Sequence, residues 1–273
     1  MMGPNDTAPL LSHLTELRNR LIVSVVAIIV GFGFCWGFSE EIFSFLMRPL
    51  KELLGPNDKM IFTGLHEAFF TYLKVSAFGG FVLALPVVLG QLWGFVAPGL
   101  YESEKRSFLP FLLMTPALFF LGAAMAYAFV FPMAFKYFLS FATPDIAAMP
   151  SISEYLSLIM TLMLAFGLVF EMPIALLLLI KTGAVSTQGL VDKRKYNIVF
   201  SFVVAGIITP PDPISQIMLA VPMCLMYEIA IFLGRGIERK KAREQNEEQS
   251  QQPGGPESHD LAQPQEPSRE SGA

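Results

Sequence analysis

A short polar stretch between two long apolar runs holds the side chains best suited to bind a charged ligand. Residues 95–106 read FVAPGLYESEKR, in which a break at Pro98 is followed by two carboxylates and two cations. A carboxylate can accept two N–H groups from one guanidinium in a planar fork, which a lysine ammonium does not imitate. Glu104, with Glu102 beside it, is therefore a candidate receptor for an arginine-bearing ligand. Pairing of Glu104 with the two cations that follow it is the competing interpretation.

A second candidate carboxylate, Glu16, lies in a helix predicted for residues 1–20. The leucines of this segment recur on one face at helical spacing, and Glu16 lies off that face. The pattern is typical of an amphipathic helix that lies on a membrane surface and continues into a first span. Glu16 could thus assist Glu104, or it could belong to a solvated helix face together with Arg18 and Arg20.

Polar side chains also occur inside the apolar runs. Glu171 precedes Lys181 by ten residues, about 15 Å of helix, which places it near the middle of a bilayer. An ionisable group at that depth is a functional candidate by default, although a carboxyl group that hydrogen-bonds neighbouring helices is the alternative. Gln216 and Tyr127 are two further intramembrane polar groups, and their spacing does not reveal whether the three share a site.

The composition indicates an integral membrane protein and argues against an enzyme. Of the 273 residues, 53% are hydrophobic and only 15% are charged, well below the usual charged fraction of about 25%. The two cysteines and three histidines show no metal-binding spacing, and no GxSG, HExxH or GxxxxGK[ST] motif is present. We therefore expect no catalytic residue, metal, cofactor or nucleic-acid partner.

Hydropathy and proline placement predict an all-α protein with six membrane spans. A polar cap should follow the first span, and structural turns should fall at Pro49, Pro98, Pro210, Pro211 and Asp212. The fifth span is short, about 13 residues or some 20 Å, and the sixth is near the minimum for crossing. The six spans are expected at residues 21–38, 68–96, 108–139, 155–180, 197–209 and 214–233.

Three regions follow from this reading: the amphipathic helix (1–20), the transmembrane domain (21–234) and a cytoplasmic tail (235–273). The tail begins basic, and its Gln-, Glu-, Pro- and Ser-rich composition predicts disorder from about residue 243. Within the first span, Gly33 and Gly37 have the spacing that lets membrane helices approach closely. Lys and Arg number 13 on the side of the termini and 3 on the other, so both termini should be cytoplasmic.

Four motifs in order resemble the TatC family, the multispanning receptor subunit of the twin-arginine protein translocase. They are HLTELR before the first span, FVAPGLYESE after the second, FEMP in the fourth, and TPPD between the fifth and sixth. The resemblance covers about residues 10 to 240. One departure is Asn19, where many relatives carry a basic residue.

The resemblance implies a glove-shaped bundle in the bacterial inner membrane that binds twin-arginine signal peptides at its cytoplasmic face. Glu104 would take the peptide arginines, Glu16 and Arg18 would contribute, and Phe95 would form the apolar side of the site. The resemblance further implies other copies of the chain, membrane lipid and the single-span subunits TatA and TatB as partners. Transport of folded cargo would use the proton-motive force without ATP.

Within that picture, Glu171 would lie in the concave face and Gln216 in a docking surface for TatA and TatB. The short fifth and sixth helices would also thin the bilayer locally. Two other classes of function compete. A secondary transporter would use Glu171 as its proton site and should show internal repeat symmetry, and a structural scaffold would only hold partner helices.

Overall fold

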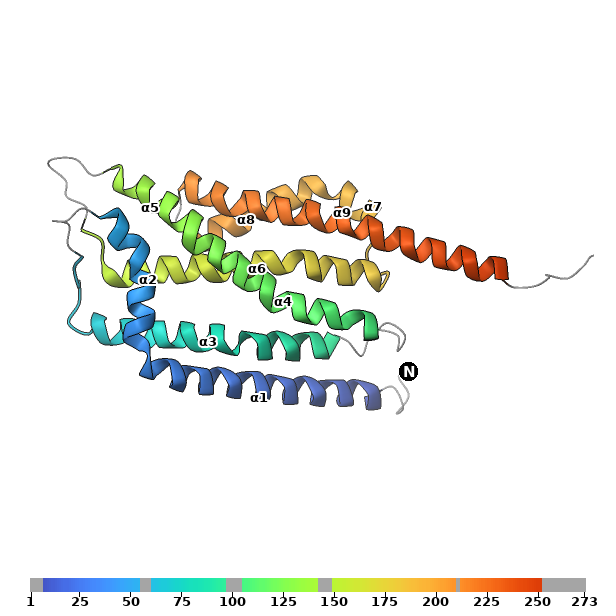
Figure 1. Cartoon of the computed structure of the whole chain (residues 1–273), viewed down its shortest axis with the longest axis horizontal. Helices are drawn as coiled ribbons and strands as arrows, with labels where there is room; N and C mark the ends of the chain where they lie inside the picture. The colour runs from blue at the N-terminus through green and yellow to red at the C-terminus, as the bar shows by residue number, and fades with distance from the viewer. Residues whose placement is uncertain (1–6, 55–59, 97–104, 142–148, 210–211, 252–273) are drawn as a thin grey trace, which may run out of the picture.

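The computed structural model describes residues 7–54, 60–96, 105–141, 149–209 and 212–251. These residues form a bundle of long helices, with α2 crossing one end (Figure 1). We call that end the α2 end, and the opposite end, where α1 begins and α9 finishes, the terminal end. The helices are α1 (Thr7–Gly37), α2 (Ser39–Leu53), α3 (Glu67–Val96), α4 (Lys105–Met125), a π-helical segment η3 (Ala126–Val130), α5 (Phe131–Leu139), α6 (Ile152–Lys181), α7 (Thr187–Asp192), α8 (Arg194–Ile208) and α9 (Pro213–Gln251).

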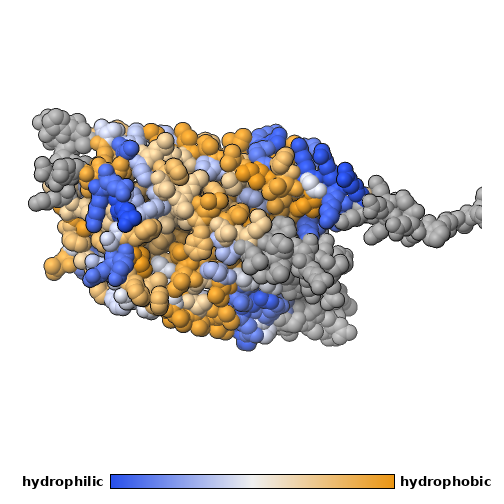
Figure 2. All heavy atoms as spheres, viewed as in Figure 1, coloured by the Kyte–Doolittle hydropathy of each residue, from blue (hydrophilic) through white to orange (hydrophobic). Residues whose placement is uncertain are grey.

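The predicted all-α membrane architecture is confirmed. Polar residues gather toward the two ends of the bundle, with a mostly apolar belt between them (Figure 2). Helix α8, the predicted short fifth span, has 15 residues, about 22 Å, which is less than a hydrocarbon core of about 30 Å. The described residues contain five helices long and apolar enough to cross a membrane, within 13–37, 67–95, 114–139, 152–181 and 213–243.

Two predicted boundaries differ from the structure. Helix α1 runs without a break from Thr7 to Gly37, so the described residues before Leu21 do not form a helix separate from the first span. No glycine or proline interrupts the chain between Pro9 and Gly31, and the helix therefore continues through the expected boundary. Helix α9 extends to Gln251, so the prediction of disorder from residue 243 is wrong up to that point. The polar stretch after Gly236 is rich in Arg, Lys, Glu and Gln, which favour helix.

Proline affects the third span and helix α2 in different ways. The third span is α4, η3 and α5 in succession, and the π-helical segment ends two residues before Pro132. Proline has no N–H for the usual helical bond, which accounts for the altered hydrogen-bond pattern. The prediction of a turn at Pro49 is wrong: Pro49 is buried inside α2, which continues to Leu53.

Helix α6 forms the centre of the bundle, and glycines allow its closest contact. A Cβ on Gly167 would lie 2.5 Å from the ring of Phe119 on α4, and one on Gly122 would lie 2.5 Å from the Phe166 carbonyl oxygen. Since such distances exclude any side chain, α4 and α6 touch backbone to ring and backbone to backbone.

Helix α1 packs against α3 through a different glycine pair from the predicted one. A Cβ on Gly31 would lie 2.5 Å from the Gly80 carbonyl oxygen, and one on Gly80 would lie 2.6 Å from the Phe32 Cα. Around Gly33 and Gly37, by contrast, nothing lies within 4 Å of an added Cβ. The predicted close approach is therefore real for α1, but it uses another face of the helix.

Candidate functional site

The terminal end carries a carboxylate that already holds a guanidinium. Arg20 donates to Glu16 Oε1 from Nε at 3.0 Å and from Nη2 at 2.7 Å. The two residues are four apart on α1, with side chains 27% and 35% exposed for Arg20 and Glu16. Two N–H groups of one guanidinium thus converge on a single oxygen of this carboxylate, at a partly open surface.

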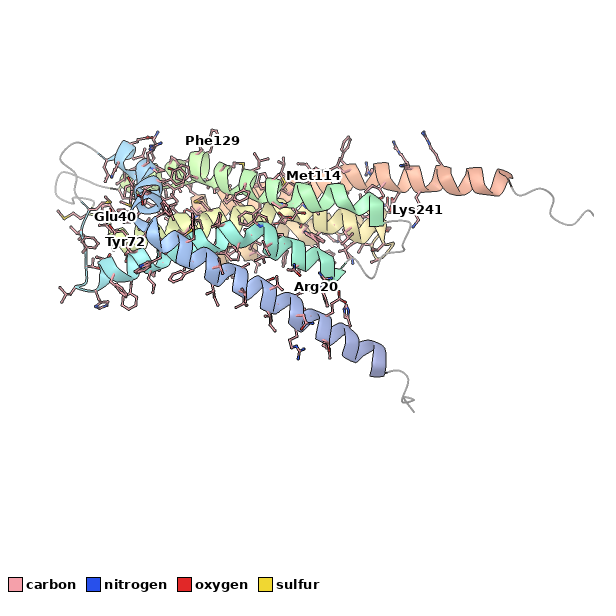
Figure 3. All side chains as sticks on the ribbon, turned by 60° about the horizontal axis from the view of Figure 1, so that its bottom comes forward. Arg20, Glu40, Tyr72, Met114, Phe129 and Lys241 are labelled. Atoms are coloured by element: carbon pink, nitrogen blue, oxygen red, sulfur yellow. The ribbon has the colours of Figure 1, made fainter. Side chains whose placement is uncertain are left out.

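Helix α3 supplies the other wall of this site. Arg20 lies between α1 and the end of α3 (Figure 3), and a Cβ on Gly94 would lie 3.1 Å from the Arg20 Cζ. Glycine at this position leaves the space that the guanidinium fills. One residue further, Phe95 stacks on His13 with ring centroids 4.2 Å apart, so an aromatic surface adjoins the ion pair.

Of the predicted peptide-binding residues, the structure brings together Glu16 and Phe95, which flank the contact between α1 and the end of α3. Arg18 is exposed on α1, and its Nη2 donates to Asn19 Oδ1 at 3.4 Å. Glu104 and Pro98 lie outside the described residues.

Tyr127 bonds to α2, the helix that contains Pro49, although no pattern in the sequence connects the two residues. The Tyr127 hydroxyl donates to the Phe45 carbonyl oxygen at 2.7 Å. Phe45 lies four residues before Pro49, so its carbonyl lacks the N–H that an ordinary helical residue would provide. The Tyr127 and Phe45 rings also stack, with centroids 4.6 Å apart. A side chain of η3 thus replaces the missing helical bond of α2.

Gln216 and Asp212 both organise the hairpin of α8 and α9. The Gln216 Nε2 donates to the Phe202 carbonyl oxygen at 2.8 Å, and a Cβ on Gly206 would lie 3.0 Å from that nitrogen. Asp212 caps α9: its Oδ2 accepts from the Ser215 N–H at 2.7 Å, with Pro213 in the first helical position. Pro210 and Pro211 lie outside the described residues.

Glu171, on α6, has a carboxyl group whose two oxygens are buried and make no hydrogen bond within the described part of the chain. Tyr127 bonds to α2 and Gln216 to α8, so the hydrogen bonds of these residues do not join the three predicted intramembrane groups into one network. The structure therefore gives each of them a separate environment.

Sequence reasoning missed two charged residues of α3. Glu67 is buried and accepts five hydrogen bonds, from the Thr63 N–H and hydroxyl, the Gly64 N–H, the Ser151 hydroxyl and the Ser153 N–H. It thereby joins the segment before α3 to the start of α6. Lys74 lies seven residues later, in an apolar span, and donates to the hydroxyls of Ser153 and Ser157. A lysine within a long apolar run was a signal that could have been noticed.

The described residues contain no group of His, Cys, Asp and Glu that could hold a metal ion. The described side chains can recognise a ligand through charge, hydrogen bonding and apolar packing. They include a carboxylate with a guanidinium at the terminal end, and scattered polar groups within the membrane-spanning helices.

Comparison with known proteins gives a consistent result. The family model described as Sec-independent protein translocase protein (TatC) matches residues 12–222. The TatC protein of Magnetococcus marinus is 62% identical over 244 residues, covering 89% of this chain and 90% of its own. For the TatC protein of Escherichia coli the identity is 40% over 234 residues, with coverages of 86% and 91%.

Solved structures agree with the sequence relatives. A crystal structure described as the twin-arginine translocase receptor TatC superimposes with a TM-score of 0.75 at 41% identity, covering 83% of this chain and 99% of that one. The same receptor in a detergent gives a TM-score of 0.75 at 42% identity, with coverages of 81% and 99%. The chain therefore belongs to the TatC family, and it is a multi-pass protein of the bacterial inner membrane and a component of the twin-arginine protein translocase.

Proposed function

We propose that this chain is the receptor of its translocase and binds twin-arginine signal peptides at the terminal end. The observation that carries the proposal is the contact of two Arg20 donors, Nε at 3.0 Å and Nη2 at 2.7 Å, with the Glu16 Oε1 atom. A carboxylate that holds one guanidinium in this way has the geometry to hold another. The terminal end would face the cytoplasm, because the loops and terminal segments on that side carry 13 Lys and Arg and the loops on the other side carry 3.

In this proposal the peptide exchanges for a resident arginine. The incoming guanidinium replaces Arg20 on Glu16, and Glu104, one residue before the start of α4, takes the second arginine. The His13–Phe95 stack offers an apolar surface to the side chains that accompany the arginines. Because an ion pair at the protein surface contributes only about 0.2–1 kcal/mol, the partly exposed Arg20 contact is weak enough to be displaced.

TatA and TatB are proposed to dock on the helices that face lipid at α8 and α9. Large apolar side chains of α8 are more than half exposed, which suits packing against a single-span helix; these are Val199, Phe200, Val203 and Ile207. The 15-residue length of α8 would thin the bilayer there, lowering the barrier to a crossing polypeptide. Further copies of this chain would complete the complex, and the proton-motive force would drive transport, which agrees with the missing GxxxxGK[ST] motif.

Binding of a fluorescent twin-arginine peptide to the purified chain in lipid nanodiscs tests the proposal. Glu16→Ala and Glu104→Ala should each weaken binding by roughly tenfold, since each removes one charge-assisted fork. Glu40→Ala, which removes an exposed carboxylate at the α2 end (Figure 3), is the matched control and should leave binding unchanged.

Two further measurements make the test sharper. A peptide with two lysines in place of the arginines should bind weakly, and equal binding would contradict recognition by a guanidinium fork. Arg20→Gln frees Glu16 and should tighten peptide binding by up to about fivefold, the equivalent of an exposed ion pair. If wild type and Glu104→Ala bound the peptide equally well, Glu104 would have no part in the site.

A further inference from the structure

Among the residues that the structure describes, Lys74 is a cation without a charged partner, in a helix long and apolar enough to cross the membrane. It lies within the apolar stretch from Glu67 to Phe95, and its Nζ donates to the hydroxyls of Ser153 and Ser157 on α6, at 3.4 Å each. No carboxylate forms an ion pair with it among the residues that the structure describes. Intramembrane lysines are rare and ordinarily have an anionic partner or line a polar path.

The depth of Lys74 corresponds to the boundary between headgroups and hydrocarbon. Lys74 follows Glu67, the first residue of α3, by seven positions, about 10 Å of helix. Side chains on a helix point toward its N-terminus, which for α3 is the α2 end, so the long side chain carries its ammonium outward to the interface. Lipid phosphates lie at that level of a bilayer.

Two adjoining cavities meet at Lys74. One, of about 380 Å³, runs along the facing surfaces of α3 and α6 into the hydrocarbon region. Besides Lys74, Ser157 and Thr161 its lining is apolar: Ala77, Phe78, Phe81, Met160 and Leu164. The other, of about 430 Å³, is more polar and is lined by the first turns of α3 and α6 and by residues just before each helix. A cation thus separates an apolar groove from a polar cavity, as the phosphate of a phospholipid separates its acyl chains from its headgroup.

The charges around the polar cavity indicate which headgroup fits. Three titratable side chains besides Lys74 line it, namely His66, Glu67 and Glu154. Both Glu67 oxygens are already occupied by the five hydrogen bonds described above, whereas Glu154 is exposed and makes no ion pair with a described residue. The cavity therefore offers one cation and one available carboxylate, which complement a phosphate linked to an amine.

We propose that this groove binds a zwitterionic phospholipid with a primary amine in its headgroup, in the leaflet at the α2 end. The phosphate pairs with Lys74 and accepts hydrogen bonds from Ser153 and Ser157. The amine lies toward Glu154, and one acyl chain follows the groove between α3 and α6. Glu67 positions the site by fixing the start of α6 to the segment before α3.

Native mass spectrometry of the full-length protein, delipidated and then offered equal amounts of phosphatidylethanolamine and phosphatidylglycerol, tests the proposal. Wild type should retain phosphatidylethanolamine preferentially. Lys74→Gln should reduce retention by roughly fivefold, the effect of one interfacial cation. Lys136→Gln removes an exposed lysine near the end of α5, also at the α2 end, and serves as the matched control.

Two other variants separate the parts of the site. Ala77→Phe should fill the apolar groove and lower lipid retention while leaving Lys74 in place, and Glu154→Gln should reduce the preference for phosphatidylethanolamine over phosphatidylglycerol. Inorganic phosphate and glycerophosphoethanolamine should compete poorly, because they lack acyl chains. The proposal is overturned by unchanged retention in Lys74→Gln or Ala77→Phe, by a wild-type preference for phosphatidylglycerol, or by competition from inorganic phosphate at lipid-like concentrations.

Discussion

The hydrogen bond from Tyr127 to Phe45 should matter only because Pro49 is a proline. In α2 the Phe45 carbonyl oxygen has no helical N–H to accept, and the Tyr127 hydroxyl donates to it at 2.7 Å. Tyr127→Phe removes this donor and preserves the ring that stacks on Phe45. We expect it to lower the free energy of unfolding by about 1–2 kcal/mol, the usual effect of leaving a carbonyl without its partner.

A double-mutant cycle isolates this dependence. In Pro49→Ala the new backbone N–H can bond to Phe45, so adding Tyr127→Phe should then have little effect. The coupling free energy between the two positions should be about 1 kcal/mol, whatever the separate effect of Pro49→Ala on packing. Reversible unfolding in mixed detergent micelles measures each member of the cycle.

Tyr155 provides the matched control. Its hydroxyl donates to the Leu46 carbonyl oxygen at 2.8 Å, but Leu46 lies four residues before Leu50, which retains its N–H. Tyr155→Phe and Pro49→Ala should therefore be additive within about 0.5 kcal/mol. Additivity of Tyr127→Phe with Pro49→Ala, or equal coupling at both tyrosines, would refute the reasoning.

Three other predictions concern single positions. Gly80→Val should separate α1 from α3 and destabilise the fold by about 1–3 kcal/mol in the same unfolding assay, because the valine side chain would meet Phe32 backbone atoms. Gly33→Val should be nearly neutral, because nothing lies near an added Cβ there. Equal effects of the two substitutions would contradict this packing. Glu67→Ala should speed proteolysis of the segment before α3 through loss of five hydrogen bonds, and Glu67→Gln should do so less, since the amide keeps one acceptor oxygen. Glu171→Leu should raise the thermal midpoint by removing a buried, unpartnered carboxyl group, yet reduce export of twin-arginine cargo; a lower midpoint would mean that Glu171 has a stabilising partner.

Features set by neighbouring residues were predictable. The apolar lengths of the spans follow from composition along the chain, and α8 is short because polar residues and prolines limit its apolar run. Asp212 caps α9 because it directly precedes Pro213, a local arrangement that needs no other element. Phe95 and Glu16 follow from local motifs as candidate site residues, and their part in peptide binding stays a prediction.

The predicted helix boundaries were wrong where composition suggested an end but no helix-breaking residue was present. The chain has no breaker near residue 20, and the polar stretch after Gly236 favours helix even though it cannot bury a core. Pro49 was misread for the opposite reason. A proline usually ends a helix, but α2 tolerates it because Tyr127, which lies 82 positions after Phe45, donates to the freed Phe45 carbonyl.

The sequence by itself determined the membrane class, the five long apolar spans, the short α8 and the positions of the charged motifs, because these depend on runs and spacings along one segment. Only the tertiary structure decided which glycine face of α1 meets α3, since several faces of that helix are equally compatible with close packing. It alone brought Arg20 against Gly94, and Glu67 to donors more than 80 positions away. Such contacts depend on how helices are rotated and aligned against one another, and residue spacing along one segment does not reveal that arrangement.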